Sequence, residues 1–179
     1  MAARVANKPV TVESVKREAG LLNQYGKIGQ KFGIKMLRHN HTTEFTPCVG
    51  SQQLPYSILL SETDPDRVVF EMDIGLLVTA GQDPIEWFHR SPGRFILWHV
   101  KDVVGLQSLP PVTNEAARLA QSQQVPIGTG EIDYKKIFGY AGLAGLKHFD
   151  IEQRTANGPW GNSIGAATLS YNNLHKMLA

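Results

Sequence analysis

A chain of 179 residues with 42% hydrophobic and 19% charged residues can bury a core, and we expect one domain over residues 1–179. The net charge of +2 argues against a nucleic-acid surface, and the one cysteine, Cys48, excludes an internal disulfide framework. Because no apolar run reaches the roughly 20 residues of a membrane span and the N-terminus lacks the apolar core of a signal peptide, we expect a cytoplasmic protein.

The sequence predicts strands that alternate with helices, beginning with a helix over residues 12–32 whose apolar positions recur every three to four residues. Thr11 can cap the start of this helix, and Gly33 can end it. The elements expected next are a strand at 34–37, a short helix at 54–60, a strand at 68–73, a helix that Asp83 caps with Pro84 in its first turn, and a strand at 94–99.

The second half is less regular at first and then continues the alternation. Residues 101–124 are broken by Pro110 and Pro111, and a short helix at 114–121 is the one element expected there. A helix ended by Gly145, a strand at 146–152 and a helix at 164–178 follow. Four strands alternating with helices predict an α/β fold of β/α units around a parallel sheet.

Each of the four strand-like runs ends in residues of types that bind metals. They are His39, His41 and Glu44 after the first run, Asp73 after the second, His99 after the third and Glu152 after the fourth. Parallel β/α enzymes place their chemistry at the C-terminal ends of their strands, so we expect these side chains to share one pocket. Carboxylates and imidazole together favour Mn²⁺, Zn²⁺, Co²⁺ or Fe²⁺, and an oxygen-rich set favours Mn²⁺ or Mg²⁺.

Other interpretations of single residues stay open. His39 and His41 share a face in extended backbone, so both can point into a site, or one of them is a packed histidine. Asp73 follows a run of core residues and needs a metal, a cation or solvent, because a buried unpaired carboxylate is costly. Glu152 is a ligand, a helix cap or a surface carboxylate.

Lys101 lies two residues after His99 and has two possible roles. Its ammonium either holds a substrate oxyanion or phosphate, or pairs with Glu71 or Asp73. The glycines of residues 128–130 either cradle a phosphate or form a tight turn, and the turn is the simpler interpretation.

Three tryptophans are candidates for the wall of a sugar site, namely Trp87, Trp98 and Trp160. Core packing is the alternative for Trp87.

Five motifs together resemble a known family. They are residues 38–45 (RHNHTTEF), 71–73 (EMD), 99–102 (HVKD), 128–133 (GTGEID) and 151–153 (IEQ). In combination they are similar to the sugar phosphate isomerase/epimerase family, the xylose isomerase-like TIM barrels. The resemblance covers residues 12–176 and corresponds to the C-terminal half of such a barrel. It implies a partial (β/α) TIM-barrel-like fold of about four parallel strands, because a closed eight-stranded barrel takes roughly 250 residues.

The resemblance also implies a divalent metal held by residues at successive strand ends. Carried over to this sequence, the metal ligands are Glu44, Asp73, His99 and Glu152. Mn²⁺ is the first choice of metal, with Mg²⁺, Co²⁺ and Zn²⁺ as alternatives. The residues expected in catalysis are His39, His41, Glu44, Glu152 and Lys101. Which of His39, His41 and Glu44 is the first ligand stays open.

Several positions depart from the family pattern and leave substrate preference open. Arg38 replaces a common aromatic residue, residues 42–43 replace Asp-Phe, Gly75 begins the stretch where similar members often carry a Trp, and Arg154 stands where an acid is frequent. The implied activity is a metal-dependent isomerase or epimerase that moves a proton on a sugar or keto-sugar through an enediolate.

Two other functions stay open. One is a lyase or hydrolase of oxidised sugars, which begins with the same deprotonation next to a carbonyl. The other is an incomplete half-barrel that needs self-association or a partner chain. We therefore expect a small-molecule sugar substrate and a homo-oligomer or partner chain, with neither nucleic acid nor membrane as a partner.

Overall fold

The computed structural model describes residues 9–107, 115–153 and 162–179. The chain divides into two compact units, one formed by residues 1–36 and 44–68 and the other by residues 37–43 and 69–179. Whether they behave as the one expected domain stays a prediction. The part of the chain that the structure describes contains no helix with the length and hydropathy needed to cross a membrane.

The first unit is built on two packed helices, α1 (Val12–Gln30) and α2 (Pro55–Glu62). The predicted cap of α1 is confirmed, because the Thr11 hydroxyl accepts a hydrogen bond from the Ser14 N–H. Asn23 joins the two helices, since its amide group donates to the Glu62 carbonyl at 2.8 Å. Both predicted helices of this region are therefore present, and α1 ends at Gln30, shortly before Gly33, which has a φ of +69°.

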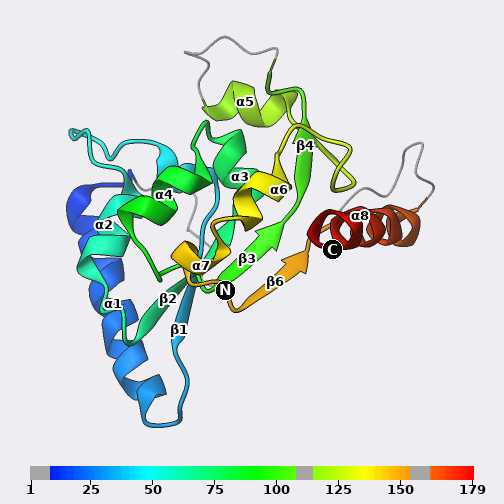
Figure 1. Ribbon diagram of the computed structural model, residues 1–179. Coiled ribbons are helices and arrows are strands. Elements are labelled where there is room, and N and C mark those ends of the chain that lie inside the picture. The colour runs from blue at the N-terminus through cyan, green and yellow to red at the C-terminus, as the bar shows by residue number, and fades with distance from the viewer. Residues whose placement is uncertain (1–8, 108–114, 154–161) are drawn as a thin grey trace. The chain divides into compact units, whose positions relative to one another are not determined.

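A four-stranded sheet in the order β1–β2–β3–β6 carries the second unit (Figure 1). Its strands are β1 (Met36–His39), β2 (Val68–Asp73), β3 (Leu97–Val100) and β6 (His148–Ile151). Except for the first residues of β1 and β2, these strands belong to that unit. β2 pairs in parallel with β3, and β3 pairs in parallel with β6. The α/β fold with parallel strands and alternating helices is therefore confirmed, and the sheet is open rather than a closed barrel.

Strand boundaries differ from the predictions by a few residues. The first strand begins two residues later than expected and includes His39, so this histidine is part of the strand and does not follow it. The third strand begins at Leu97, three residues after its predicted start at residue 94. The second strand has the predicted bounds. Apolar runs therefore located all four strands of this sheet, but backbone pairing decides where each one starts.

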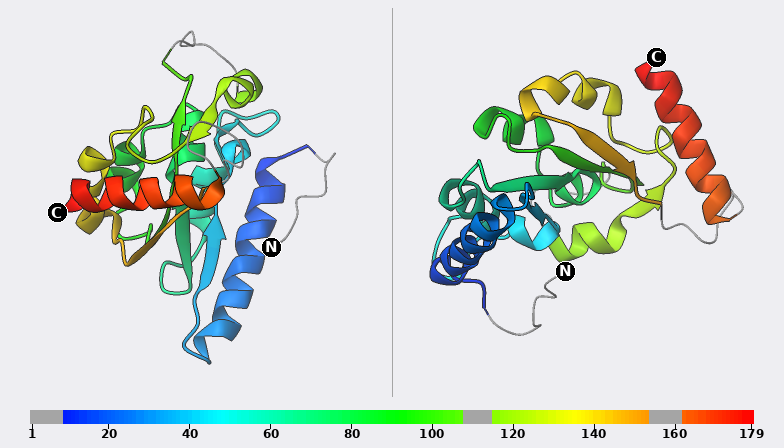
Figure 2. Two further views of the ribbon diagram at one scale, coloured as in Figure 1. Left: turned by 90° about the vertical axis from the view of Figure 1, so that its right-hand side faces the viewer. Right: turned by 90° about the horizontal axis from the view of Figure 1, so that it is seen from below.

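The helices of the second unit are α3 (Ile74–Thr79), α4 (Pro84–Arg90), α5 (Glu115–Gln121), α6 (Tyr134–Phe138), α7 (Ala141–Ala144) and α8 (Ser163–Leu178). The predicted Asp83 cap of α4 is confirmed by its 2.8 Å hydrogen bond from the Ile85 N–H. α8 contacts β6 and α6, and its place beside β6 is visible in Figure 2.

Two elements of this unit were not predicted. Helix α3 follows β2 directly, because Asp73, at the end of the strand, also caps the helix. The region expected to be irregular contains a two-stranded antiparallel sheet of β4 (Asp102–Val104) and β5 (Gln123–Val125).

Aromatic side chains fill the core of the second unit. Trp98 is fully buried, and its ring stacks on Phe88 with centroids 5.1 Å apart and planes 2° apart. Phe138 packs against the same indole at 5.2 Å. Because side chains alternate along a strand, Trp98 lies on the opposite face from His99. Trp98 and the buried Trp87 are therefore core residues and not a sugar wall, whereas Trp160 lies outside the described residues.

One buried carboxylate, that of Asp102, holds the loop that precedes α6. Its Oδ1 accepts hydrogen bonds from the N–H groups of Val103 and Ile132, and its Oδ2 accepts them from Gly128 and Gly130 at 2.9 and 3.0 Å. Burial raises the pKa of the Asp102 carboxyl, and these hydrogen bonds act in the opposite direction. Both glycine N–H groups are used internally, which favours the tight turn over the phosphate cradle.

The hydrogen bonds of Asp102 predict a clear loss of stability for Asp102→Asn. The new amide group would face backbone donors, so we expect the free energy of unfolding to fall by about 1–3 kcal/mol. Urea denaturation measures the change. Asp133→Asn is the matched control, because Asp133 caps α6 and asparagine caps a helix as well as aspartate does. This substitution should change the free energy of unfolding by at most about 0.5 kcal/mol. Equal effects of the two substitutions would contradict this role of Asp102.

Candidate metal centre at the strand ends

Strand register brings three acidic and imidazole groups to one level of the sheet. Asp73 is the Cα partner of His99, and His99 is the Cα partner of Asp150. His99 Nδ1 lies 3.5 Å from Glu152 Oε2 and 4.0 Å from Asp73 Oδ2. The ends of β2, β3 and β6 thus converge, and three of the expected ligands, Asp73, His99 and Glu152, form one cluster.

The carboxylate of Asp73 is fully buried, and it both caps a helix and forms an ion pair. Its Oδ1 accepts a hydrogen bond from the Leu76 N–H at 2.9 Å, which caps α3, and its Oδ2 lies 2.7 Å from Lys101 Nζ. Burial raises the pKa of the Asp73 carboxyl, and the Lys101 ammonium acts in the opposite direction. Of the partners expected for this carboxylate, namely a metal, a cation or solvent, the structure shows the cation, which is Lys101.

Lys101 bridges two of the candidate ligands, since its Nζ also lies 2.5 Å from Glu152 Oε2. Its backbone is fixed by Tyr134, whose hydroxyl accepts from the Lys101 N–H at 3.0 Å and donates to the Lys101 carbonyl at 2.6 Å. Its aliphatic chain lies against Gly75, where a Cβ would come within 2.2 Å of Lys101 Cγ. Gly75, a departure from the family pattern, therefore makes room for the lysine.

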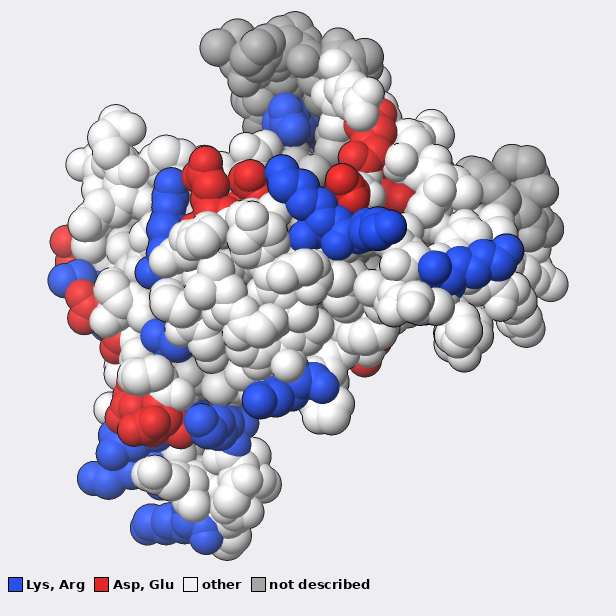
Figure 3. Space-filling view, in the orientation of Figure 1, with Lys and Arg blue, Asp and Glu red and all other residues white. Residues whose placement is uncertain are grey.

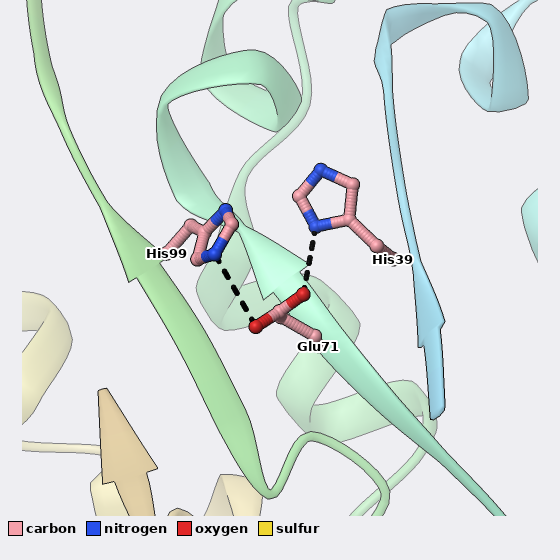
Figure 4. Close-up of side chains that lie close together, drawn as sticks. All are labelled: His39, Glu71 and His99. Carbon is pink, nitrogen blue, oxygen red and sulfur yellow. Dashed lines mark hydrogen bonds and ion pairs between the residues drawn. The ribbon is translucent and has the colours of Figure 1, made fainter. Parts of the chain in front are cut away.

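A second group of side chains adjoins the first through His99. Glu71 Oε2 lies 3.1 Å from His39 Nδ1, and Glu71 Oε1 lies 3.3 Å from His99 Nε2 (Figure 4). Burial and the neighbouring His99 lower the pKa of His39 to about 4, although Glu71 opposes the shift. His39 is therefore a neutral imidazole at neutral pH.

The other candidates from the first strand take different positions. The exposed His41 ring packs edge-on against His39 with centroids 5.0 Å apart. The buried Asn40 between them accepts from the Asp73 N–H at 2.9 Å and donates to the Asp73 carbonyl at 3.2 Å. Glu44 is buried in the first unit, and its part in the metal centre stays a prediction.

The donor set fits a divalent cation. His99 Nδ1 is buried and makes no hydrogen bond to any residue that the structure describes, although two carboxylate oxygens face it. The carboxylates of Asp73 and Glu152 outnumber the one ammonium of Lys101, so the cluster carries an excess of negative charge. Carboxylate and imidazole are ligands that Mn²⁺, Co²⁺ and Zn²⁺ accept. The ligand atoms of Asp73, His99 and Glu152 lie within 4.8 Å of one another.

Three residues near the site were not among the predicted site residues. Glu71 joins two histidines, Asn40 ties the end of β1 to Asp73, and Asp150 Oδ2 lies 3.4 Å from His99 Nε2. The sequence held one usable signal, because Glu71 and Asp73 share a face of the same strand. Their partners depend on strand register, which the sequence does not give.

Charges on the molecular surface are mixed. In the face drawn in Figure 3, Lys and Arg side chains lie at several separate places, and Asp and Glu side chains lie next to them in some of these.

No family model matches the chain. Curated relatives include the inosose dehydratases of Lacticaseibacillus casei and of Clostridium tetani (strain Massachusetts / E88). They are 30% identical over 132 residues and 31% identical over 136 residues. These matches cover 72% and 73% of this chain but 43% and 44% of the relatives, so the chain spans less than half of their length.

Solved structures share the fold over nearly the whole chain. A sugar phosphate isomerase/epimerase from Parabacteroides distasonis ATCC 8503 matches with a TM-score of 0.74 and 24% identity, over 96% of this chain and 56% of that chain. A xylose isomerase-like TIM barrel protein from Mycobacterium smegmatis, in complex with magnesium, matches with a TM-score of 0.63 and 16% identity over 97% and 55%. An L-ribulose 3-epimerase matches with a TM-score of 0.67 and 13% identity over 97% and 57%.

The fold is therefore that of the xylose isomerase-like TIM barrels, of which this chain provides a partial, open version. The resemblance inferred from the five motifs is confirmed at the level of the fold.

The packing of Lys101 against Gly75 predicts opposite effects for two glycine-to-alanine substitutions. Gly75→Ala should overpack the site and lower the free energy of unfolding by about 1–3 kcal/mol, because the new methyl group collides with the lysine chain. Gly142→Ala in α7 meets no atom within 4 Å and should stabilise by at most about 1 kcal/mol. Urea denaturation measures the free energy of unfolding of both variants. A more stable Gly75→Ala variant would contradict the described packing.

The lowered pKa of His39 predicts a loss of stability in acid. Between pH 6.5 and pH 4 the unfolded chain binds a proton on His39 that the folded protein does not bind, so the free energy of unfolding falls as the pH falls. From pH 7 to pH 5 this contribution amounts to about 1–2 kcal/mol after allowance for partial exposure, and His39→Gln should lack it. Chemical denaturation at both pH values, with a chelator present, measures the difference.

The matched control is His89→Gln, which removes an exposed histidine outside the cluster and should keep the wild-type pH dependence. The raised pKa values of Asp73 and Asp102 act in the opposite direction but are common to all three proteins. An unchanged pH dependence in His39→Gln would show that His39 does not titrate as described.

Proposed function

We propose that the strand ends form the divalent-metal site of an enzyme that moves a proton on a carbon next to the carbonyl of a sugar, keto-sugar or sugar phosphate. The reaction is an isomerisation or epimerisation through an enediolate. The observation that carries the proposal is the convergence of Asp73, His99 and Glu152 from three neighbouring strands around the ammonium of Lys101.

In this proposal Asp73, His99 and Glu152 hold the metal, with Glu44 as the fourth ligand. Mn²⁺ is the first choice, and Mg²⁺, Co²⁺ and Zn²⁺ are alternatives, because the set combines carboxylates with one imidazole. When bound, the cation would polarise neighbouring oxygens of the substrate.

The side chains of this chain supply the proton transfer and hold the developing charge. Glu152 or Glu44 removes the proton next to the carbonyl, helped by His39 or His41. His39 suits this role, because a neutral imidazole at neutral pH can accept a proton. Lys101, which is nearly buried and already lies between two carboxylates, offers its ammonium to a substrate oxyanion.

A dehydratase is the second candidate, because the curated relatives described above are inosose dehydratases. Such a lyase starts with the same removal of a proton next to a carbonyl. The electron pair left on carbon then forms a double bond and expels the hydroxyl group of the next carbon, which takes up the proton held by the base and leaves as water. The same base and the same oxyanion partner serve both reactions, and the products distinguish them.

We also infer that a second copy of this chain or a partner chain completes the barrel around the substrate. Within the described residues β6 pairs with β3 alone, and Phe149 of β6 and Tyr171 of α8 are 41% and 60% exposed. Free parallel edges and exposed apolar side chains are normally paired or covered in natural proteins.

Metal content and proton exchange test the proposal together. Size-exclusion chromatography with light scattering first separates assembly states, and each fraction is then analysed for metal and incubated with ketoses and a keto-inositol in deuterated water. We expect one bound metal per chain and deuterium on the carbon next to the carbonyl in the assembled fraction. Asp73→Asn should weaken metal binding at least about tenfold and abolish exchange, since a ligand matters at least as much as its supporting residues.

Asp83→Asn is the control, because it keeps the cap of α4 and lies outside the site. A product that has lost water would favour the dehydratase over the isomerase. Neither metal nor exchange in any fraction would contradict the proposed enzyme, and exchange by a stable monomer would contradict the need for a second chain.

A further inference from the structure

We propose that Glu71 is a positioning residue that fixes the tautomers of two histidines, His99 and His39, so that both turn a lone pair toward the metal centre. The inference rests on the proposed function, because it assigns a supporting residue to that same site.

Glu71 uses its two carboxylate oxygens on two different strands. It lies on β2, the strand between β1 and β3, with Oε1 3.3 Å from His99 Nε2 and Oε2 3.1 Å from His39 Nδ1 (Figure 4). Its side chain is only 12% exposed, so water competes little for these contacts. One carboxylate therefore contacts both imidazoles at once.

The tautomers follow from the chemistry of the contacting groups. A neutral imidazole has one N–H group and one lone pair, and an ionised carboxylate can only accept hydrogen bonds. Each ring lies closer to Glu71, at 3.1 and 3.3 Å, than its other nitrogen lies to any carboxylate, at 3.5 to 4.0 Å. We therefore assign the protons to the nitrogens that face Glu71, as His99 Nε2–H and His39 Nδ1–H. The remaining nitrogens, His99 Nδ1 and His39 Nε2, are left with their lone pairs.

Both lone pairs belong to nitrogens beside the same carboxylate oxygen. His99 Nδ1 lies 4.0 Å from Asp73 Oδ2, and His39 Nε2 lies 3.8 Å from that atom. His99 Nδ1 also lies 3.5 Å from Glu152 Oε2. Glu71 thus prepares His99 as a metal ligand through Nδ1 and His39 as a proton acceptor or second ligand through Nε2.

The same geometry argues against a second metal held by His39, Glu71 and His99, although these three groups also lie close enough to hold one. A metal on each nitrogen of His99 would require the imidazole to lose its last proton, because a neutral ring offers one lone pair. A metal bound at Nδ1 instead leaves Nε2 as a hydrogen-bond donor, and Glu71 is its acceptor. Histidine ligands commonly donate their other N–H to a carboxylate in this way.

Asp150 provides a matched control for this role. Its Oδ2 lies 3.4 Å from His99 Nε2, nearly as close as Glu71, but its side chain is 62% exposed and does not contact His39 in the part of the chain that the structure describes. Solvent weakens such an exposed contact. If Glu71 positions the rings, Asp150→Asn should change little and Glu71→Gln should change much.

The experiment combines histidine NMR with metal titration. Long-range ¹H–¹⁵N spectra of the metal-free protein report which ring nitrogen carries the proton, and we expect Nε2–H for His99 and Nδ1–H for His39. In Glu71→Gln the new amide offers one acceptor and one donor group, so at least one ring must change tautomer to accept from it. Titration with Mn²⁺ and Zn²⁺ should give one ion per chain in the wild type and an affinity about 10–100-fold lower in Glu71→Gln.

Asp150→Asn should keep both tautomers and the wild-type affinity within about twofold, as expected for an exposed contact. Opposite tautomers in the wild type, two ions per chain, or a Glu71→Gln variant with unchanged tautomers and affinity would each overturn the proposal. The wild-type spectra need no variant, so a misfolded Glu71→Gln protein does not prevent the test. A wild type that binds no metal but has the expected tautomers would support the role of Glu71 and contradict the proposed metal enzyme.

Discussion

The ion pair between the buried carboxylate of Asp73 and the ammonium of Lys101 is the interaction on which the second unit depends. A buried carboxylate without a partner would be costly. Here one oxygen accepts a hydrogen bond from the start of α3, and the other forms an ion pair with the lysine. The same carboxylate faces His99 and His39. Lys101 also pairs with Glu152, so this one ammonium brings two of the candidate ligands together.

Packing and hydrogen bonds around Lys101 hold its side chain in the position that pairs with Asp73. Tyr134 fixes its backbone from one side, and the missing side chain of Gly75 leaves space for its aliphatic chain on the other. The next residue, Asp102, holds the loop before α6 through three backbone N–H groups of that loop. The residues that follow β3 therefore combine a charged group for the site with a carboxylate that organises the loop.

The sequence predicted the strands and the core of the site because both leave local signals. Short apolar runs marked all four strands, and polar residues at their ends marked Asp73, His99 and Glu152. The roles of Glu71 and Gly75 could not be predicted, since they depend on strand register and on the approach of a lysine that follows another strand. The antiparallel pair of β4 and β5 was missed because its strands have three residues each, too few to show an alternating pattern.

Binding of a cation and enclosure of a sugar depend on different parts of the structure, whereas a complete barrel would provide both. Asp73, His99 and Glu152 come from β2, β3 and the end of β6, and these neighbouring strands are held together by their own parallel pairing. Binding of a cation by these three groups therefore depends on contacts within one unit. Enclosure of a sugar depends on further walls, because an open sheet leaves one side of a pocket to solvent, and water weakens the electrostatic contacts that stabilise a developing oxyanion. In the proposed enzyme, metal affinity should therefore be less sensitive to assembly than proton transfer.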